Sequence, residues 1–149
     1  MPGFVDAHGH FPGSGQTVFS VDLNSPPIGD VTNIEQVVAR LSGLASKRAD
    51  GWVVGHGYDD TLLREKRHPT REDLDRVSRD RPVAVVHVSG HLAAVNSAAL
   101  EILGIDESTP DPEGGVIVRD RASADGRRPN GVWRRLPPAP CGTTLWILG

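Results

Sequence analysis

The chain has 149 residues, a size that allows one hydrophobic core and excludes a large multidomain protein. Hydrophobic residues make up 38%, and 17 glycines with 12 prolines predict a folded but turn-rich protein. The net charge is -3, without a long run of either sign, which argues against a nucleic-acid-binding arm or a polybasic membrane anchor. A small molecule is therefore the expected type of ligand.

Cysteine content and hydropathy bear on the location of the chain. The single cysteine, Cys141, cannot form an internal disulfide, which is typical of a reducing compartment. The longest apolar run, residues 83–86, is far shorter than the roughly 20 residues that cross a bilayer, and no leader pattern follows Met1. We expect a cytoplasmic protein without a membrane partner.

The first expected element is a short strand that ends near His10, before the breaker sequence at residues 12–15. Within this strand, one glycine separates His8 from His10. Alternate residues of a strand project to the same face, so the two imidazoles can bind one metal ion. The alternative interpretation is a pair of partly exposed histidines at a strand end.

A helix and a strand are expected next. Thr32 and Glu35 have the spacing of a capping box, and apolar residues at helical spacing extend to about Lys47. Residues 51–55 are apolar and bounded by glycines, which predicts a buried strand that ends in a loop at residues 56–60.

The alternation continues in the middle of the chain. A short second helix is expected to begin at Pro69 and Thr70 and to stop before Pro82, with the mixed charges of residues 64–81 facing solvent. Residues 82–88 predict a parallel strand buried on both faces. Apolar positions at helical spacing predict a third helix over residues 92–103.

This order predicts an α/β fold with a parallel sheet built from three strand–helix units. Residues 114–118 and 130–133 are expected to pair as a hairpin across a polar segment. A proline-rich tail without a regular element begins at Arg134.

Several polar residues at strand ends are candidate functional residues. His91 follows a buried strand, where barrel enzymes place active-site groups, although it could instead cap a helix or bind a loop carbonyl. Tyr58 and Asp59 could line the mouth of a pocket, and a solvated turn is the favoured alternative. Asn96 lies near an apolar stripe, so its amide is expected to find a buried partner and to brace the His91 loop. The other histidines, His56, His68 and His87, are expected to be structural.

Several segments resemble the amidohydrolase superfamily. Residues 2–11, Pro-Gly-Phe-Val-Asp-Ala-His-Gly-His-Phe, resemble its first barrel strand. The resemblance continues in Gly-His-Gly-Tyr-Asp at residues 55–59 and is strongest in Ser-Gly-His at residues 89–91 with the Asn-Ser-Ala-Ala-Leu that follows. Together the motifs are similar to the amidohydrolase 3 branch over residues 1–133, whereas residues 134–149 do not match it.

The resemblance implies a metal-dependent hydrolase on a (β/α)8 TIM barrel, of which this chain would hold the first three βα units and a β-hairpin insertion. It implies that His8 and His10 are metal ligands and that His91, with Asp59, contacts substrate. A divalent ion, commonly zinc, would activate water for hydrolysis of a non-peptide C–N bond in a small amide-type molecule.

The length sets a limit on this interpretation, because a complete barrel takes about 250 residues. We expect an incomplete and inactive fragment of doubtful metal occupancy that self-associates through exposed sheet edges. No catalytic residue is assigned, and whether the chain alone is an enzyme stays open. The competing hypothesis is a small non-catalytic α/β module that binds metal or a partner through His8, His10 and His91.

Overall fold

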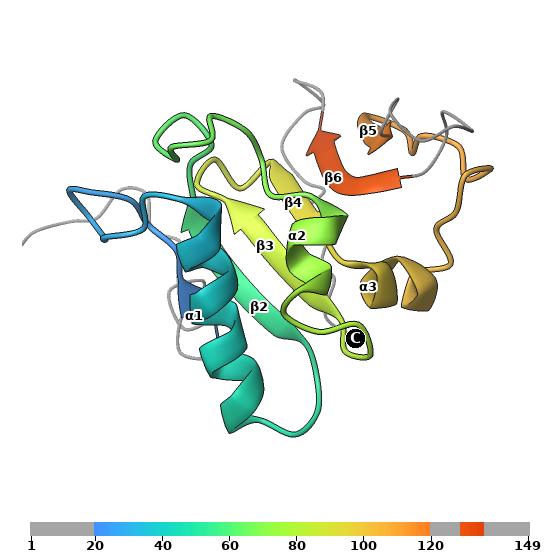
Figure 1. Cartoon of the computed structure of the whole chain (residues 1–149). Helices are drawn as coiled ribbons and strands as arrows, with labels where there is room; N and C mark the ends of the chain where they lie inside the picture. Colours follow the sequence, from blue (N-terminus) through green and yellow to red (C-terminus); the bar gives the residue numbers. More distant parts are fainter. Residues whose placement is uncertain (1–19, 120–128, 136–149) are drawn as a thin grey trace, which may run out of the picture.

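The structure is a computed structural model, and it describes residues 20–119 and the backbone of residues 129–135 (Figure 1). The expected strand with His8 and His10 lies outside the described residues, as do the polar segment at residues 120–128 and residues 136–149 of the expected tail. The prediction that the tail begins at Arg134 was wrong by two residues, since Arg134 and Arg135 belong to a strand. None of the helices in the described part has the length and apolar character needed to cross a bilayer.

The described strands form one mixed sheet with the order β1-β2-β3-β4-β6-β5. Three neighbouring strands, β1, β2 and β3, run parallel, and β4, β6 and β5 continue the sheet in antiparallel pairs. The predicted hairpin is confirmed, because β5 pairs with β6. The strands are β1 (Val21–Asp22), β2 (Val53–Tyr58), β3 (Val83–His87), β4 (Leu92–Val95), β5 (Gly115–Arg119) and β6 (Pro129–Arg135).

Two helices connect the parallel strands and lie over one face of the sheet (Figure 1). They are α1 (Ile34–Lys47) and α2 (Arg71–Asp75), which follow β1 and β2 respectively. Right-handed crossovers that advance in one direction place their helices on the same face. The main core fills the space between this face and the helices, and it includes Leu23, Val37, Leu41, Val53, Leu74, Val83 and Val85.

A second, smaller cluster lies where α3 (Ser97–Ile102) packs on the sheet. Val95 and Leu100 belong to it, and Ala84 of β3 packs against it. Because Val83 and Val85 face the main core, the alternate residues of β3 are covered on both sides. The predicted strand is confirmed and is parallel to β2, but it pairs antiparallel with β4, and Ala84 and Val86 on its second face are only half-buried.

The first helix begins one residue later than its sequence pattern suggests. Asn33, not Thr32, is the N-cap, and its side chain accepts a hydrogen bond from the Gln36 amide at 2.8 Å. The Gln36 side chain reaches back to the Thr32 amide at 2.7 Å. Glu35 does not complete a capping box, because it pairs with Arg76 at 2.7 Å.

The prediction that β2 ends at Gly55 was wrong, since the strand continues to Tyr58. Gly55 lies inside the strand, where the Leu23 side chain packs against its backbone. A larger residue would not fit, because a Cβ at this position would lie 2.4 Å from Leu23 Cδ1. The glycine reflects a close approach between β2 and its neighbour rather than a strand end.

The prediction of a third helix over residues 92–103 was also wrong in its first half. Leu92–Val95 forms β4, which pairs antiparallel with β3, and the helix begins only at Ser97. A short apolar run satisfies helical and strand spacing equally well, so periodicity could not separate them. The described chain therefore has two βα crossovers followed by an antiparallel hairpin, not three βα units.

The second helix is shorter than expected, because it ends at Asp75 rather than continuing toward Pro82. Its predicted start is confirmed, and it opens with a capping box in which Thr70 is the N-cap and the Asp73 side chain accepts from the Thr70 amide. Beyond the helix, the carbonyls of Ser78 and Arg81 accept hydrogen bonds from Asn96. These bonds hold the chain in a loop before β3.

Candidate functional site

A bulge at the end of β2 aligns the candidate site. The pairing of β2 with β3 shifts register between His56 and Tyr58, and Gly57 has a φ of 93°. As a result Tyr58 pairs with His87 at the carboxyl ends of two parallel strands. Parallel sheets commonly place their ligand sites at this edge.

We predict that Gly57→Ala destabilises the protein by about 1–3 kcal/mol, because alanine is strained at this φ. A Cβ would also lie 2.6 Å from Asn24 Oδ1. The free energy of unfolding in urea measures the effect. Gly43→Ala is the control, since Gly43 lies in α1 and a Cβ there meets nothing within 4 Å. Equal stability of the two variants would contradict a strained bulge.

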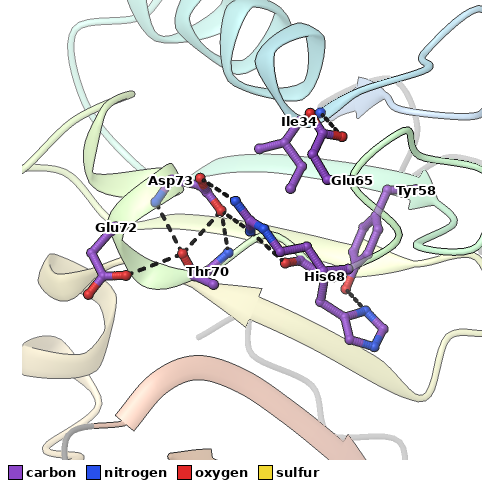
Figure 2. Close-up of polar contacts among 8 residues, drawn as sticks. Ile34, Tyr58, Glu65, His68, Thr70, Glu72 and Asp73 are labelled. Carbon is purple, nitrogen blue, oxygen red and sulfur yellow. Dashed lines mark hydrogen bonds and ion pairs between the residues drawn. The ribbon is translucent and has the colours of Figure 1, made fainter. Parts of the chain in front are cut away.

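Tyr58 forms the buried floor of the site, with none of its surface exposed. Its hydroxyl lies 3.3 Å from Nδ1 of His68, as Figure 2 shows. The ring of His87 meets the Tyr58 ring edge to face, with 5.2 Å between centroids. Burial, together with the nearby Asp60 carboxylate, raises the pKa of the Tyr58 phenol, so the hydroxyl stays protonated at neutral pH.

Asp60 lies between two histidines that are far apart in the sequence. One carboxylate oxygen, Oδ1, lies 3.2 Å from Nε2 of His87 and 3.6 Å from Nδ1 of His68. All three side chains are largely buried, with 25%, 12% and 22% of their surface exposed for Asp60, His87 and His68. The two imidazole rings lie 5.8 Å apart, so one acid faces two bases in a small volume.

His68 is held by the start of α2. Arg67 donates to the His68 carbonyl at 3.0 Å and to the Asp73 carboxylate at 2.6 Å. Asp73 in turn accepts from the Thr70 amide at 2.8 Å (Figure 2). Burial opposes ionisation of Asp73, but the bonds from Arg67 and Thr70 outweigh it and lower the pKa of this carboxyl. The ionised capping box thus fixes the backbone that carries His68.

Hydrogen bonds link His87 to the loop that carries His91. Nδ1 of His87 lies 2.8 Å from the Ser89 hydroxyl and accepts from the Ser89 amide at 3.1 Å. The Ser89 hydroxyl also accepts from the His91 amide at 3.3 Å. His91 itself is exposed in the turn between β3 and β4.

The sequence-derived site residues are only partly visible. His8 and His10 lie outside the described residues, so their role as metal ligands stays a prediction. Asp59 forms the favoured turn, since its Oδ1 accepts from the Thr61 amide at 2.9 Å and from the Thr61 hydroxyl at 2.6 Å. Asp59 and His91 remain predictions as substrate contacts, although both lie at the carboxyl edge of β2 and β3.

Asn96 has the structural role expected of a buried amide, but it braces a different loop. It is fully buried, and its Oδ1 accepts from the amides of Val83 and Ala99. Its Nδ2 donates to the carbonyls of Ser78 and Arg81. Asn96 thus caps α3 and ties the chain before β3, rather than the His91 turn.

Sequence reasoning missed the cluster of Asp60, His68 and His87, which it treated as a turn residue and two structural histidines. The usable signal was position, because each polar residue lies at or beyond a strand end at one sheet edge. Oxygen and nitrogen atoms of Asp59, Asp60 and His87 all lie within 4.8 Å of one another. Carboxylates and imidazole in this arrangement can exchange protons or bind a divalent cation.

Comparisons with known proteins agree with this fold. The sequence profile of the amidohydrolase family matches residues 1–136. A solved structure of an uncharacterized metal-dependent hydrolase from Pyrococcus horikoshii OT3 aligns with a TM-score of 0.56 and 25% identity, covering 91% of this chain and 22% of that chain.

Two curated relatives match over 120 residues, which is 80% of this chain and 22% of each relative. They are YtcJ of Bacillus subtilis, 40% identical, and N-substituted formamide deformylase of Arthrobacter pascens, 37% identical. This chain therefore spans about a fifth of the length of the relatives it matches. Because the family profile covers most of its residues, the chain belongs to the amidohydrolase family, in its amidohydrolase 3 branch.

Proposed function

We propose that the chain contributes the first metal-binding strand and part of the pocket of a metal-dependent hydrolase. The reaction is hydrolysis of a non-peptide C–N bond in a small amide-type molecule. The observation that carries the proposal is the family match over residues 1–136, which includes His8-Gly9-His10. Membership in the amidohydrolase 3 branch, with a formamide deformylase among the relatives, indicates this class of bond.

His8 and His10 are proposed as metal ligands that project from one face of a strand. A bound divalent ion, with zinc as the first candidate, supplies an activated water and polarises the scissile carbonyl. Asp59 and His91 are proposed to contact substrate from the carboxyl ends of β2 and β3. The single Cys141 is consistent with a cytoplasmic location, which is part of the proposal.

The parallel strands β1, β2 and β3 are proposed to be part of a (β/α)8 barrel. Alone, the 149 residues are proposed to be inactive, because His8 and His10 supply only two of the three or more protein ligands that catalytic metal sites use. Among the described strands, β1 and β5 form the two edges of the sheet, and such edges favour self-association of an isolated chain.

A chimera tests the proposed activity. Residues 1–133 of this chain replace the matching stretch of N-substituted formamide deformylase, and turnover of an N-substituted formamide is measured. We expect the chimera to hydrolyse the formamide and to bind metal. We expect the double substitution His8→Ala and His10→Ala to abolish this hydrolysis. The unmodified 149-residue chain, assayed beside it, is expected to show no turnover.

The control for folding is His56→Ala in the same chimera, since His56 is a half-buried strand residue with no proposed catalytic role. A chimera that folds and binds metal but keeps its activity after loss of His8 and His10 would refute their proposed role. A metal-loaded 149-residue chain that hydrolyses the amide would overturn its proposed inactivity. A monomeric chain that melts cooperatively and binds metal through His8 and His10 without turnover would favour the small binding module instead.

A further inference from the structure

We propose that Asp59, Asp60 and His87 form a divalent-cation site that does not use His8 or His10. This inference goes beyond the proposed hydrolysis and does not depend on it, and it gives Asp59 a ligand role in place of the proposed substrate contact. It rests on the placement of two carboxylates and one imidazole at the carboxyl ends of β2 and β3, where their ligand atoms lie within 4.8 Å of one another.

The spacing between two of the ligand atoms matches that around a bound metal ion. Ligands about 2.0–2.2 Å from a tetrahedral ion lie about 3.3 Å from each other. Nε2 of His87 and Oδ1 of Asp60 are 3.2 Å apart. Yet Nε2 is buried and has no hydrogen-bond partner among the described residues, because the contact lacks hydrogen-bond geometry. A cation between the two atoms would satisfy both.

The surroundings also provide the groups that orient metal ligands. A ligating histidine usually donates its other ring N–H to a nearby acceptor. Here the Ser89 hydroxyl lies 2.8 Å from Nδ1 of His87 and can accept that proton. The Asp60 carboxylate has His68 beside it at 3.6 Å, and Asp59 is held by its two bonds from Thr61.

Binding requires a change of tautomer at His87. Without metal, Nδ1 accepts from the Ser89 amide, so the neutral ring carries its proton on Nε2, facing Asp60. With metal on Nε2, the proton must move to Nδ1, and the Ser89 amide gives up its bond to that nitrogen. One carboxylate from each aspartate balances a divalent charge, and this donor set suits Zn²⁺, Co²⁺ or Mn²⁺.

The test uses the 149-residue chain with the substitutions His8→Ala and His10→Ala. This variant is titrated with Zn²⁺ alone, and calorimetry measures the binding. We expect one remaining equivalent of bound Zn²⁺. Adding Asp60→Asn or His87→Gln is expected to weaken that binding at least 100-fold, and Ser89→Ala is expected to weaken it about 10–100-fold. Asp80→Asn is the matched control, because Asp80 is exposed near the opposite end of β3.

A ¹⁵N NMR spectrum of the unsubstituted chain provides a second measurement. It does not require any substituted variant to fold. Zn²⁺ is expected to shift the Nε2 resonance of His87 and to move the ring proton to Nδ1 in long-range ¹H–¹⁵N spectra. Loss of all Zn²⁺ binding with His8 and His10, or an unchanged His87 ring at saturating Zn²⁺, would overturn the proposal. Neither result would bear on the turnover of the chimera, so the two proposals fail separately.

Discussion

Asn96→Ala is expected to lower the free energy of unfolding by about 3–5 kcal/mol. The Asn96 side chain is fully buried and makes four hydrogen bonds of 2.8–3.0 Å to backbone groups. Alanine removes all four and leaves two amides and two carbonyls without these partners where little water can replace them. Urea unfolding followed by circular dichroism measures the loss, which should appear as a lower midpoint with an unchanged slope.

The matched control is Asn33→Ala. Asn33 also caps a helix, but it is only half-buried, and its cap bond is the single one from the Gln36 amide. Loss of a cap alone costs about 1 kcal/mol. If both variants lost the same stability, the bonds from Asn96 to the loop before β3 would contribute nothing, and capping of α3 would account for its whole effect.

The elements that sequence could predict are those with a local cause. Apolar spacing located α1, although its predicted cap was one residue off, and the run of residues 82–88 located β3, because both apolar patterns are long. The end of β2 and the start of α3 depend on distant partners. Leu23 packs against Gly55, and β3 pairs with residues 92–95. No pattern within those segments records these contacts.

The residues of the candidate site likewise divide into those that a local sequence signal reveals and those that depend on distant contacts. Asn96 was recognised as a buried amide because a polar residue interrupts an apolar stripe, which is a local signal. The convergence of Asp60, His68 and His87 requires the bulge at Gly57 and the capping box at Thr70, which set the directions of two separate segments. Glycine is an ambiguous sign, since Gly55 marks a close approach and Gly57 a left-handed backbone.

Arg81 is a residue whose importance the charge pattern concealed. It was expected to face solvent with the other charges of residues 64–81, but it is half-buried. Its guanidinium donates to four carbonyls, at 2.9 Å to Ala45, 2.6 Å to Arg48, 2.9 Å to Asp50 and 3.3 Å to Gly51. These bonds join the end of α1 and the start of β2 to the loop before β3.

We therefore predict that Arg81→Met lowers the free energy of unfolding by about 2–4 kcal/mol and that Arg81→Lys causes a smaller loss. Methionine keeps the apolar stem but removes every hydrogen-bond donor. Lysine keeps the charge, but its single ammonium cannot reach all four carbonyls that surround the planar guanidinium. Arg79→Lys, at an exposed position nearby, should change stability by less than about 0.5 kcal/mol. Urea unfolding ranks the three variants. A lysine variant as stable as the unsubstituted chain would mean that charge near the end of α1, rather than the fork, accounts for the effect of Arg81.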